Sequence, residues 1–317
     1  MTATANEPLV SVIIPTRNRA QLLRRSIASV LAQTYCNLEV IVVNDASTDQ
    51  TREVLATIDD PRLLVIHGEI NKGAAAARNA GIRIAKGEWL SFQDDDDYWL
   101  VQKLEKQVQS LMSAPSGVGW CLAGYFCVEP QRCFYVGGDR YVTGINYRNG
   151  NVFGKPDYRL IATPGWLVRR DLLERAGLFD ERLRSYDDWE LGLRLDQITK
   201  RIHVDEPLFI QDQTLGGGLM KLERARAADM RIIMEKHGHL WACNRQVLAR
   251  HWYFIGRAES LHDPHPAGRD ALMQSLRQRP ARIRTWGALA LAYMNHDFMR
   301  RITAAIRRWR EARLPGS

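Results

Sequence analysis

The sequence is poor in cysteine and lacks the spacings that build metal or disulfide frameworks. Its five cysteines are odd in number and include no Cys-x-x-Cys pair; they are Cys36, Cys121, Cys127, Cys133 and Cys243. A zinc site or a disulfide framework is therefore not expected, and the pattern suits a reducing compartment.

Long hydrophobic runs are also missing. The longest weakly polar stretch, residues 286–294, is far shorter than the run of about 20 residues that crosses a bilayer. Residues 1–8 have neither the basic start nor the apolar core of a signal peptide. We expect a cytoplasmic protein, either soluble or peripheral on the cytoplasmic face of the inner membrane.

Two glycine-rich nucleotide motifs are absent as well. No Gly-x-Gly-x-x-Gly follows the first apolar run, residues 9–14, and no Gly-Lys-Ser/Thr occurs anywhere. These absences argue against a dinucleotide-binding Rossmann enzyme and against a P-loop nucleotidase. Bound phosphates would then be met through a metal held by aspartates and by basic residues such as Arg78.

Positive charge is concentrated at the end of the chain. Residues 239–317 contain 14 Arg, no Lys and five acidic residues, whereas the rest of the chain has 30 basic and 31 acidic residues. A basic end favours an anionic partner, and because no nucleic-acid motif accompanies it, nucleic acid is not expected. In residues 298–310, Ile302, Ile306 and Trp309 would share one helix face, which predicts a helix in an anionic membrane interface. Packing of this face on the preceding helices is the alternative.

Apolar runs alternate with helical patterns through the first hundred residues. Strands are predicted at 9–14, 38–43, 63–66 and 89–92, with helices between them. This order indicates an α/β fold with a mostly parallel, doubly wound sheet, whose carboxyl edge would bring Pro15, Asp45 and Asp94 together. Further strands are predicted near 118–128, 133–136, 166–168 and 202–210. We assign residues 1–218 to one large domain, in two parts at 9–99 and 100–218, and residues 219–317 to a helical region.

Four consecutive aspartates follow the fourth predicted strand, at Asp94–Asp97. Adjacent carboxylates repel one another, and their hard oxygens suit Mg²⁺ or Mn²⁺, which substrate phosphates also bind. A solvated acidic loop is the alternative interpretation of this run taken alone.

Several stretches, taken together and in order, resemble the family 2 glycosyltransferases with the GT-A fold. They are VSVIIPTRNRAQLLRRSIASVLAQTY, VIVVNDASTDQT, NKGAAAARNAGI, GEWLSFQDDDDYW and GLFDERLRSYDDWELGLRL, within residues 9–210. The resemblance implies a GT-A catalytic domain at 1–218, with nucleotide-sugar binding at 9–99 and the acceptor side at 100–218. It also implies that an all-helical, Arg-rich C-terminal extension follows at 219–317.

The resemblance also implies roles for single residues. Asp45 corresponds to the aspartate that binds the nucleobase, and Asp96, with Asp94, to the metal ligands. The other nucleotide-binding positions are Pro15, Thr16, Asn18, Arg78, Asp94 and Asp95. The wholly acidic run leaves its register open, because Asp95 and Asp97 could substitute.

The general base is implied at Asp188, the second carboxylate before Trp189, in preference to Asp187 and Glu190. A first-turn position, where the helix dipole favours anions, is the structural alternative. Family members often carry a His or Arg after the last strand of the sheet. Here residues 211–214 read Gln-Asp-Gln-Thr, which puts a third side-chain ligand in doubt, and Gly216–Gly218 predict a mobile loop. The aromatic-rich stretch 137–163 could bind acceptor or cover the core.

The sequence thus predicts a metal-dependent, inverting enzyme that moves a sugar from a UDP-sugar, or another nucleoside diphosphate sugar, to an acceptor hydroxyl. Mn²⁺ or Mg²⁺ would be its cofactor, and a carbohydrate or lipid-linked saccharide of polysaccharide or glycolipid synthesis its acceptor. A nucleotidyltransferase would need a Gly-, Arg- and Lys-rich loop after the first strand, whereas Thr16–Arg19 supplies two Arg and no Gly. A non-catalytic sugar-nucleotide-binding protein would tend to lose a metal or base carboxylate, and both sets are present.

Overall fold

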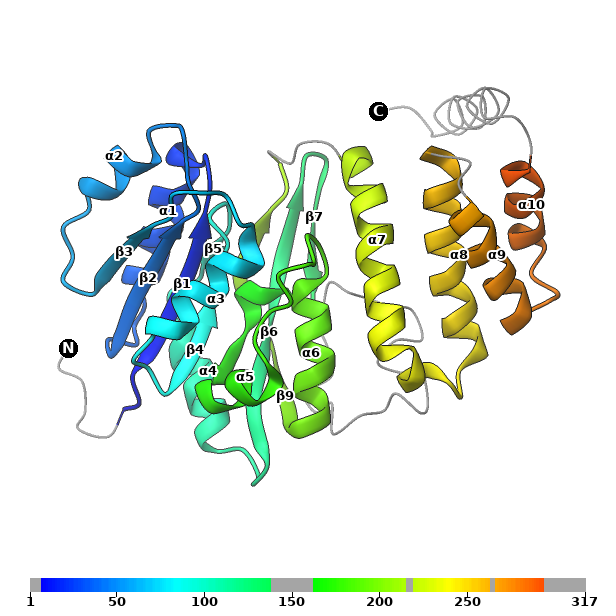
Figure 1. Cartoon of the computed structure of the whole chain (residues 1–317). Coiled ribbons are helices and arrows are strands. Elements are labelled where there is room, and N and C mark those ends of the chain that lie inside the picture. The colour runs from blue at the N-terminus through cyan, green and yellow to red at the C-terminus, as the bar shows by residue number, and fades with distance from the viewer. Residues whose placement is uncertain (1–6, 138–161, 215–218, 263–265, 294–317) are drawn as a thin grey trace. The chain divides into compact units, whose positions relative to one another are not determined.

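A computed structural model describes residues 7–137, 162–214, 219–262 and 266–293 (Figure 1). The chain divides into two compact units, Met1–Asn146 with Pro156–Gly217, and Tyr147–Lys155 with Gly218–Ser317. In its described residues the first unit is built on a nine-stranded sheet, and the second is helical. The predicted α/β class with a helical C-terminal extension is confirmed.

The first half of the sheet is parallel. It contains β1 (Val10–Thr16), β2 (Leu38–Asn44), β3 (Leu63–His67) and β4 (Trp89–Phe92), in the order β3-β2-β1-β4. The β-branched runs of β1 and β2 are almost wholly buried, as expected for strands covered on both faces. The register pairs Thr16 with Asn44 and Ile13 with Phe92. The loops that follow these strands therefore emerge at one edge, as predicted.

Helices cover both faces of this half. They are α1 (Ala20–Leu31), α2 (Thr51–Ala56) and α3 (Ala74–Ile84). Gly81 lets α3 approach β1 closely, because a Cβ on Gly81 would lie 2.6 Å from Cγ2 of Ile13. This close approach holds α3, which carries the buried Arg78, against the first strand of the sheet.

The second half of the sheet mixes strand directions. It contains β5 (Tyr98–Trp99), β6 (Val118–Glu129), β7 (Arg132–Val136), β8 (Leu167–Arg169) and β9 (Lys200–Asp212). β8 joins the halves by pairing antiparallel with both β4 and β6. β6 and β9 pair in parallel, and the short β5 closes the far edge against β9. The helices of this half are α4 (Lys103–Met112), the short 3₁₀ turn η3 (Thr163–Gly165), α5 (Arg170–Ala176) and α6 (Asp187–Ile198).

A lysine is buried between α4 and β4. The Lys103 ammonium donates to Oγ of Ser91 at 3.1 Å and to Oε1 of Gln107 at 2.7 Å, and it lies 3.7 Å from the ring centroid of Trp99. Burial away from water lowers the pKa of Lys103 to about 7. These contacts fix the strand that leads into the acidic run.

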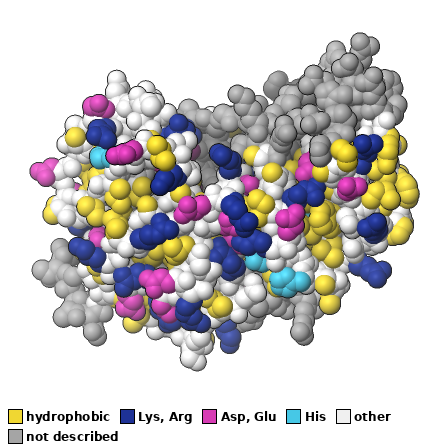
Figure 2. Space-filling view, viewed as in Figure 1, with side chains coloured by type: hydrophobic (Ala, Val, Ile, Leu, Met, Phe, Trp, Pro, Cys, Tyr) yellow, Lys and Arg dark blue, Asp and Glu magenta, His cyan; other side chains and the backbone are white. Residues whose placement is uncertain are grey.

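The second unit consists of α7 (Leu219–His237), η4 (Gly238–Trp241), α8 (Arg245–His262), α9 (Pro266–Gln278) and α10 (Ile283–Ala292). In the described residues these elements confirm the all-helical C-terminal extension that the resemblance implies. Gly256 lies so close to α9 that a Cβ there would be 2.7 Å from the carbonyl oxygen of Gly268. Figure 2 shows hydrophobic and basic side chains interspersed at the surface of the described residues of this unit. Ile283 is 83% exposed on α10.

Some sequence predictions lie outside the described residues. They are the interfacial helix at 298–310, the glycines at 216–218 and nearly all of the aromatic stretch at 137–163. Among the described helices, none combines the length and the apolar character needed to cross a bilayer.

The approach of α3 to β1 gives a stability prediction. Gly81→Ala places a methyl group against Ile13, so we expect a loss of about 1–3 kcal/mol in the free energy of unfolding. The matched change, Gly287→Ala in α10, meets no atom within 4 Å and is expected to gain about 0.5–1 kcal/mol from helix propensity. Urea denaturation followed by circular dichroism measures both, and equal stabilities of the two variants would contradict the close packing.

Candidate active site

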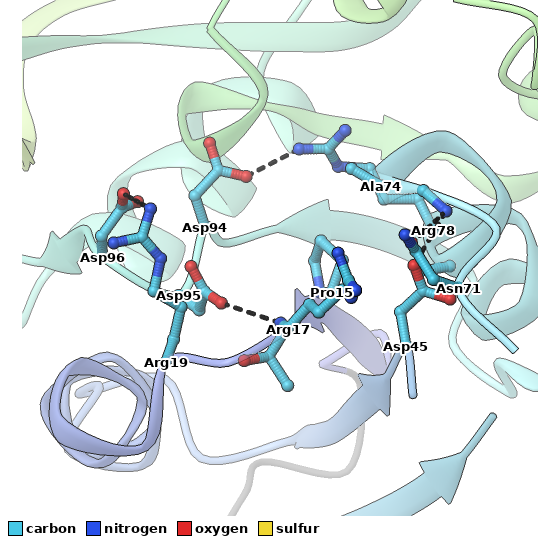
Figure 3. Close-up of a pocket in the computed structure, with 13 residues that line it drawn as sticks. Pro15, Arg17, Arg19, Asp45, Asn71, Ala74, Arg78, Asp94, Asp95 and Asp96 are labelled. Atoms are coloured by element: carbon cyan, nitrogen blue, oxygen red, sulfur yellow. Dashed lines mark hydrogen bonds and ion pairs between the residues drawn. The ribbon is translucent and has the colours of Figure 1, made fainter. Parts of the chain in front are cut away.

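A cavity of about 290 Å³ opens at the carboxyl edge of the parallel strands (Figure 3). It is lined by Pro15, Thr16, Arg17, Arg19, Asp45, Asn71, Gly73, Ala74, Ala77, Arg78, Asp94, Asp95 and Asp96. All but one of the residues that the sequence assigned to nucleotide or metal line this cavity. The exception is Asn18, whose side-chain oxygen accepts a hydrogen bond from the Thr48 N–H at 2.8 Å. It thereby ties the loop after β1 to the loop after β2.

Asp45 supports the loop that begins α3. Its two carboxylate oxygens accept hydrogen bonds from the N–H groups of Lys72 and Gly73, each at 2.8 Å. Gly73 has a φ of 92°, a left-handed conformation that glycine adopts without strain. Because each carboxylate oxygen has a second lone pair, Asp45 retains the capacity to accept a nucleobase N–H.

The structure separates the four aspartates into two groups. Asp94, Asp95 and Asp96 line the cavity, whereas the Asp97 side chain is buried and accepts a hydrogen bond from the Asp212 N–H at 3.0 Å. Asp97 is thus not among the residues that line the cavity. Of the two residues that could have substituted in the acidic run, the structure places only Asp95 there.

Negative charge in the cavity is only partly neutralised. Asp96 lies 3.7 Å from the guanidinium of Arg19, and Asp95 accepts a long hydrogen bond, 3.4 Å, from the Arg17 N–H (Figure 3). Burial raises the pKa of Asp95 to about 7, and the charges of Asp96 and Asp94 act in the same direction. The pKa of Asp96 is likewise raised, by burial and then by Asp94. A bound cation would stabilise the ionised form of these carboxylates, which burial disfavours.

The residues present fit a metal site that a ligand completes. No three metal-ligating side chains gather closely enough to hold an ion by themselves within the described residues. Mg²⁺, however, is commonly held by one or two carboxylates together with substrate phosphates. Asp94 and Asp96 supply two such carboxylates in the lining of the cavity, which Arg17 and Arg19 also line. Asp212 lies nearby, but its carboxylate is 3.0 Å from the Arg25 guanidinium.

Arg78 joins this cavity to the start of α6. Its Nη2 lies 2.7 Å from Oδ1 of Asp94, and its Nη1 lies 2.7 Å from Oδ2 of Asp187. The Arg78 side chain is only 8% exposed. Burial disfavours its charge, but Asp187 and Asp94 outweigh burial and raise the pKa of Arg78 above its ordinary value. The guanidinium therefore stays charged and holds two distant segments together.

Asp188 lies in the first turn of α6, beside this ion pair. Its Oδ1 accepts a hydrogen bond from the Trp189 N–H at 2.6 Å. Burial, and then the neighbouring charge of Asp187, raise the pKa of Asp188. Asp187 is paired with Arg78, and Glu190 has no exposed side-chain surface and lies 2.5 Å from Arg194. The other two carboxylates are thus paired with arginines, and the raised pKa of Asp188 suits acceptance of a proton.

Sequence reasoning did not single out several residues of the cavity. Arg17 and Arg19 come directly after β1, and Asn71 and Gly73 come directly before α3. Their position next to strand and helix ends was the available signal, since those loops meet at the carboxyl edge. Asn18, which has a φ of 54°, lies between the two arginines, and of their side chains it is the Arg19 guanidinium that lies 3.7 Å from Asp96.

Comparison with known proteins places these features in a family. The model of "Glycosyl transferase family 2" matches residues 11–177. A putative colanic acid biosynthesis glycosyl transferase, WcaA of Escherichia coli K12, is 46% identical over 197 residues, which cover 60% of this chain and 67% of that protein. The E. coli UDP-Glc:alpha-D-GlcNAc-diphosphoundecaprenol beta-1,3-glucosyltransferase WfaP is 42% identical over 100 residues, 32% of this chain and 40% of that one.

A solved structure supports the fold. The mannosyltransferase PcManGT of Pyrobaculum calidifontis, in complex with GDP-Man and Mn²⁺, superimposes with a TM-score of 0.58 at 21% identity. The match covers 95% of this chain and 84% of that one. The sheet, the carboxylate-lined cavity and the family match agree, and the chain belongs to glycosyl transferase family 2, with the GT-A fold.

Proposed function

We propose that this glycosyltransferase moves a sugar from a UDP-sugar to an acceptor hydroxyl with inversion at C1, and that it depends on Mn²⁺ or Mg²⁺. The observation that carries the proposal is the double ion pair of Arg78. Arg78 pairs with Asp94 in the cavity and with Asp187, the neighbour of Asp188, and this supports a donor site and a base on the two sides of one guanidinium. The name of the relative WfaP, which includes UDP-Glc, supports the choice of nucleotide.

On the donor side, the cavity offers a matching group for each part of a nucleoside diphosphate. Asp45 would accept the N–H of the base, and Pro15 and Thr16 line the same cavity. Arg17 and Arg19 would face the diphosphate. Asp94 and Asp96 would hold the divalent cation, which when bound offsets the charge that grows on the departing diphosphate.

On the acceptor side, Asp188 would act as the general base. Its carboxylate takes the proton of the acceptor hydroxyl while the oxygen of that hydroxyl forms the new bond to C1. The bond from C1 to the diphosphate oxygen breaks at the same time, and its electron pair leaves with UDP. Attack on the face opposite the leaving group inverts C1.

For the acceptor we propose a carbohydrate or a lipid-linked saccharide of cell-surface polysaccharide or glycolipid synthesis. The names of WcaA and WfaP, which mention colanic acid biosynthesis and a diphosphoundecaprenol acceptor, support this class. Attachment to an anionic membrane through residues 298–310, and hence a peripheral place on the cytoplasmic face of the inner membrane, stays a prediction. Those residues lie outside the described part of the chain.

The function and its metal are tested together. We expect release of UDP from a panel of UDP-sugars in the presence of a lipid-linked acceptor and Mn²⁺, and less release of GDP from GDP-mannose. Asp96→Asn removes a charged ligand, so turnover and Mn²⁺-assisted UDP binding are expected to be lost. Full turnover of the wild-type protein in excess EDTA would exclude the metal, and release of GDP alone would overturn the choice of UDP.

Two substitutions separate chemistry from binding. Asp188→Asn keeps the shape of the base but cannot take a proton, so we expect turnover to fall about 10²- to 10⁴-fold with UDP affinity retained. Asp45→Asn alters the group that faces the nucleobase, so UDP affinity is expected to fall with turnover at saturation nearly normal. Calorimetric titration with UDP and steady-state kinetics decide this. A loss of UDP affinity in Asp188→Asn, together with a loss of turnover at saturation in Asp45→Asn, would contradict both assignments.

The raised pKa of Asp188 predicts a pH dependence. The base must be deprotonated, so turnover falls as the pH drops through its pKa. Because Asp187 contributes to the raised value, Asp187→Asn is expected to move the acid limb of the turnover profile to lower pH. Asp171→Asn, which alters a half-exposed carboxylate paired with Arg169, serves as the control and is expected to leave the limb in place. A limb that stays in place in Asp187→Asn, or moves to higher pH, argues against the assignment.

A further inference from the structure

The segment between α5 and α6, residues 177–186, is conformationally strained. Gly177, Leu178 and Tyr186 have φ values of 89°, 58° and 59°. Left-handed conformations are unfavourable for residues that carry a Cβ, so Leu178 and Tyr186 hold them only because their surroundings impose them. Tyr186 directly precedes Asp187 and Asp188, and the path of this segment therefore sets where the base lies.

One set of contacts holds the segment to α6 itself. The Arg194 guanidinium donates to the carbonyl oxygens of Ala176 and, at 2.6 Å, Leu178. Glu190, which has no exposed side-chain surface, fixes that guanidinium by an ion pair of 2.5 Å. These contacts fix the segment against its own helix but do not relate it to the donor cavity.

Asn79 supplies the link to the donor side. It lies on α3, next to Arg78, and is 2% exposed. Its Nδ2 donates to the Phe179 carbonyl oxygen and to Oε1 of Glu181, and its Oδ1 accepts from the Phe179 N–H, all at 2.9 Å. The side-chain amide thus pairs with both backbone groups of Phe179, as a neighbouring β-strand would.

The ring of Phe179 extends this link to β4, the strand that precedes the aspartates. It lies edge-on to Phe92, the last residue of β4, with centroids 5.3 Å apart, and stacks on Trp166 at 6.2 Å. The Cζ atom of Arg78 lies 5.5 Å from the same ring. Phe179 is therefore held by α3 through its backbone and by β4 through its ring.

We propose that Asn79 is a positioning residue for the transfer reaction, which sets the distance between the donor cavity and the base by fixing Phe179. The inference rests on the proposed function, in which Asp188 is the base. Asn79 touches neither the cavity lining nor Asp188 in any hydrogen bond of the structure's described residues. Arg78 thus joins the donor cavity to α6 by ion pairs, and Asn79 joins the two sides by hydrogen bonds to the backbone of Phe179.

Asn79→Asp tests this role with almost no change of volume. It replaces the donating amide group by an oxygen that faces the Phe179 carbonyl and Glu181, so the pairing breaks. We expect kcat to fall by about 10- to 100-fold, because small displacements of reacting groups cost this much, with the Kd for UDP within about twofold of wild type. Asn79→Ser, which is smaller and uncharged, is expected to show the same split if the aspartate variant does not fold.

Two control variants separate positioning from general destabilisation. Val108→Ala removes buried side-chain volume from α4, and Glu181→Gln keeps an acceptor for the Asn79 amide while removing a charge. Both are expected to retain wild-type kcat, although Val108→Ala lowers the melting temperature. Asn79 variants with wild-type kcat, or with a loss no larger than that of Val108→Ala at matched stability, would overturn the proposal.

A measurement without substrate keeps this test apart from that of the function. Hydrogen–deuterium exchange is expected to rise in residues 178–189 of Asn79→Asp, while strand β2 and the start of α3 stay protected. Unchanged exchange in residues 178–189 overturns the positioning role whether or not sugar is transferred. If exchange rises but the wild-type protein transfers no sugar, the proposed function is wrong, and Asn79 still fixes residues 178–189. If Asp188→Asn keeps full turnover, Asp188 is not the base, and Asn79 then has no positioning role in the transfer reaction.

Discussion

A buried guanidinium shared by two carboxylates organises this site. Arg78 pairs with Asp94 after β4 and with Asp187 at the start of α6, and both contacts are 2.7 Å long. Removing one partner from a buried pair leaves an uncompensated charge, which is far more costly than losing a surface pair. The donor cavity and the base are therefore coupled electrostatically before any substrate arrives, and their spacing depends on where α3 lies on the sheet.

The placement of α3 follows from small residues. Alanines occupy its buried face, and Gly81 lets the helix contact Ile13 of β1 directly. Close packing of this kind makes the helix a rigid reference for the loops around it. Asp45 ties down its start, while Asn79 and Arg78 extend from it toward the acceptor half. One helix thus relates the nucleotide loops to the base.

Excess negative charge is the second constraint. Asp94, Asp95 and Asp96 line one cavity. The pKa values of Asp95 and Asp96 are raised because burial disfavours their ionised forms. A protein can keep such a cluster when its ligand brings a cation or when arginines lie nearby, and here Arg17 and Arg19 do. Adjacent, partly buried carboxylates destabilise the fold, and such unfavourable arrangements are common at functional sites, where they serve binding.

The sequence by itself determined the fold class, the strand and helix order, and the meeting of Asp45 and Asp94 at one edge of the sheet, because hydrophobic period and strand ends are local properties. It could not decide between Asp95 and Asp97, since four adjacent aspartates look alike until Asp97 is seen bound to the Asp212 N–H. Nor could it join Arg78 to Asp187 or Asn79 to Phe179, which are about a hundred residues apart in the chain. Only tertiary packing brings such residues together, because pairing across that separation depends on how α3 and α6 lie on one sheet.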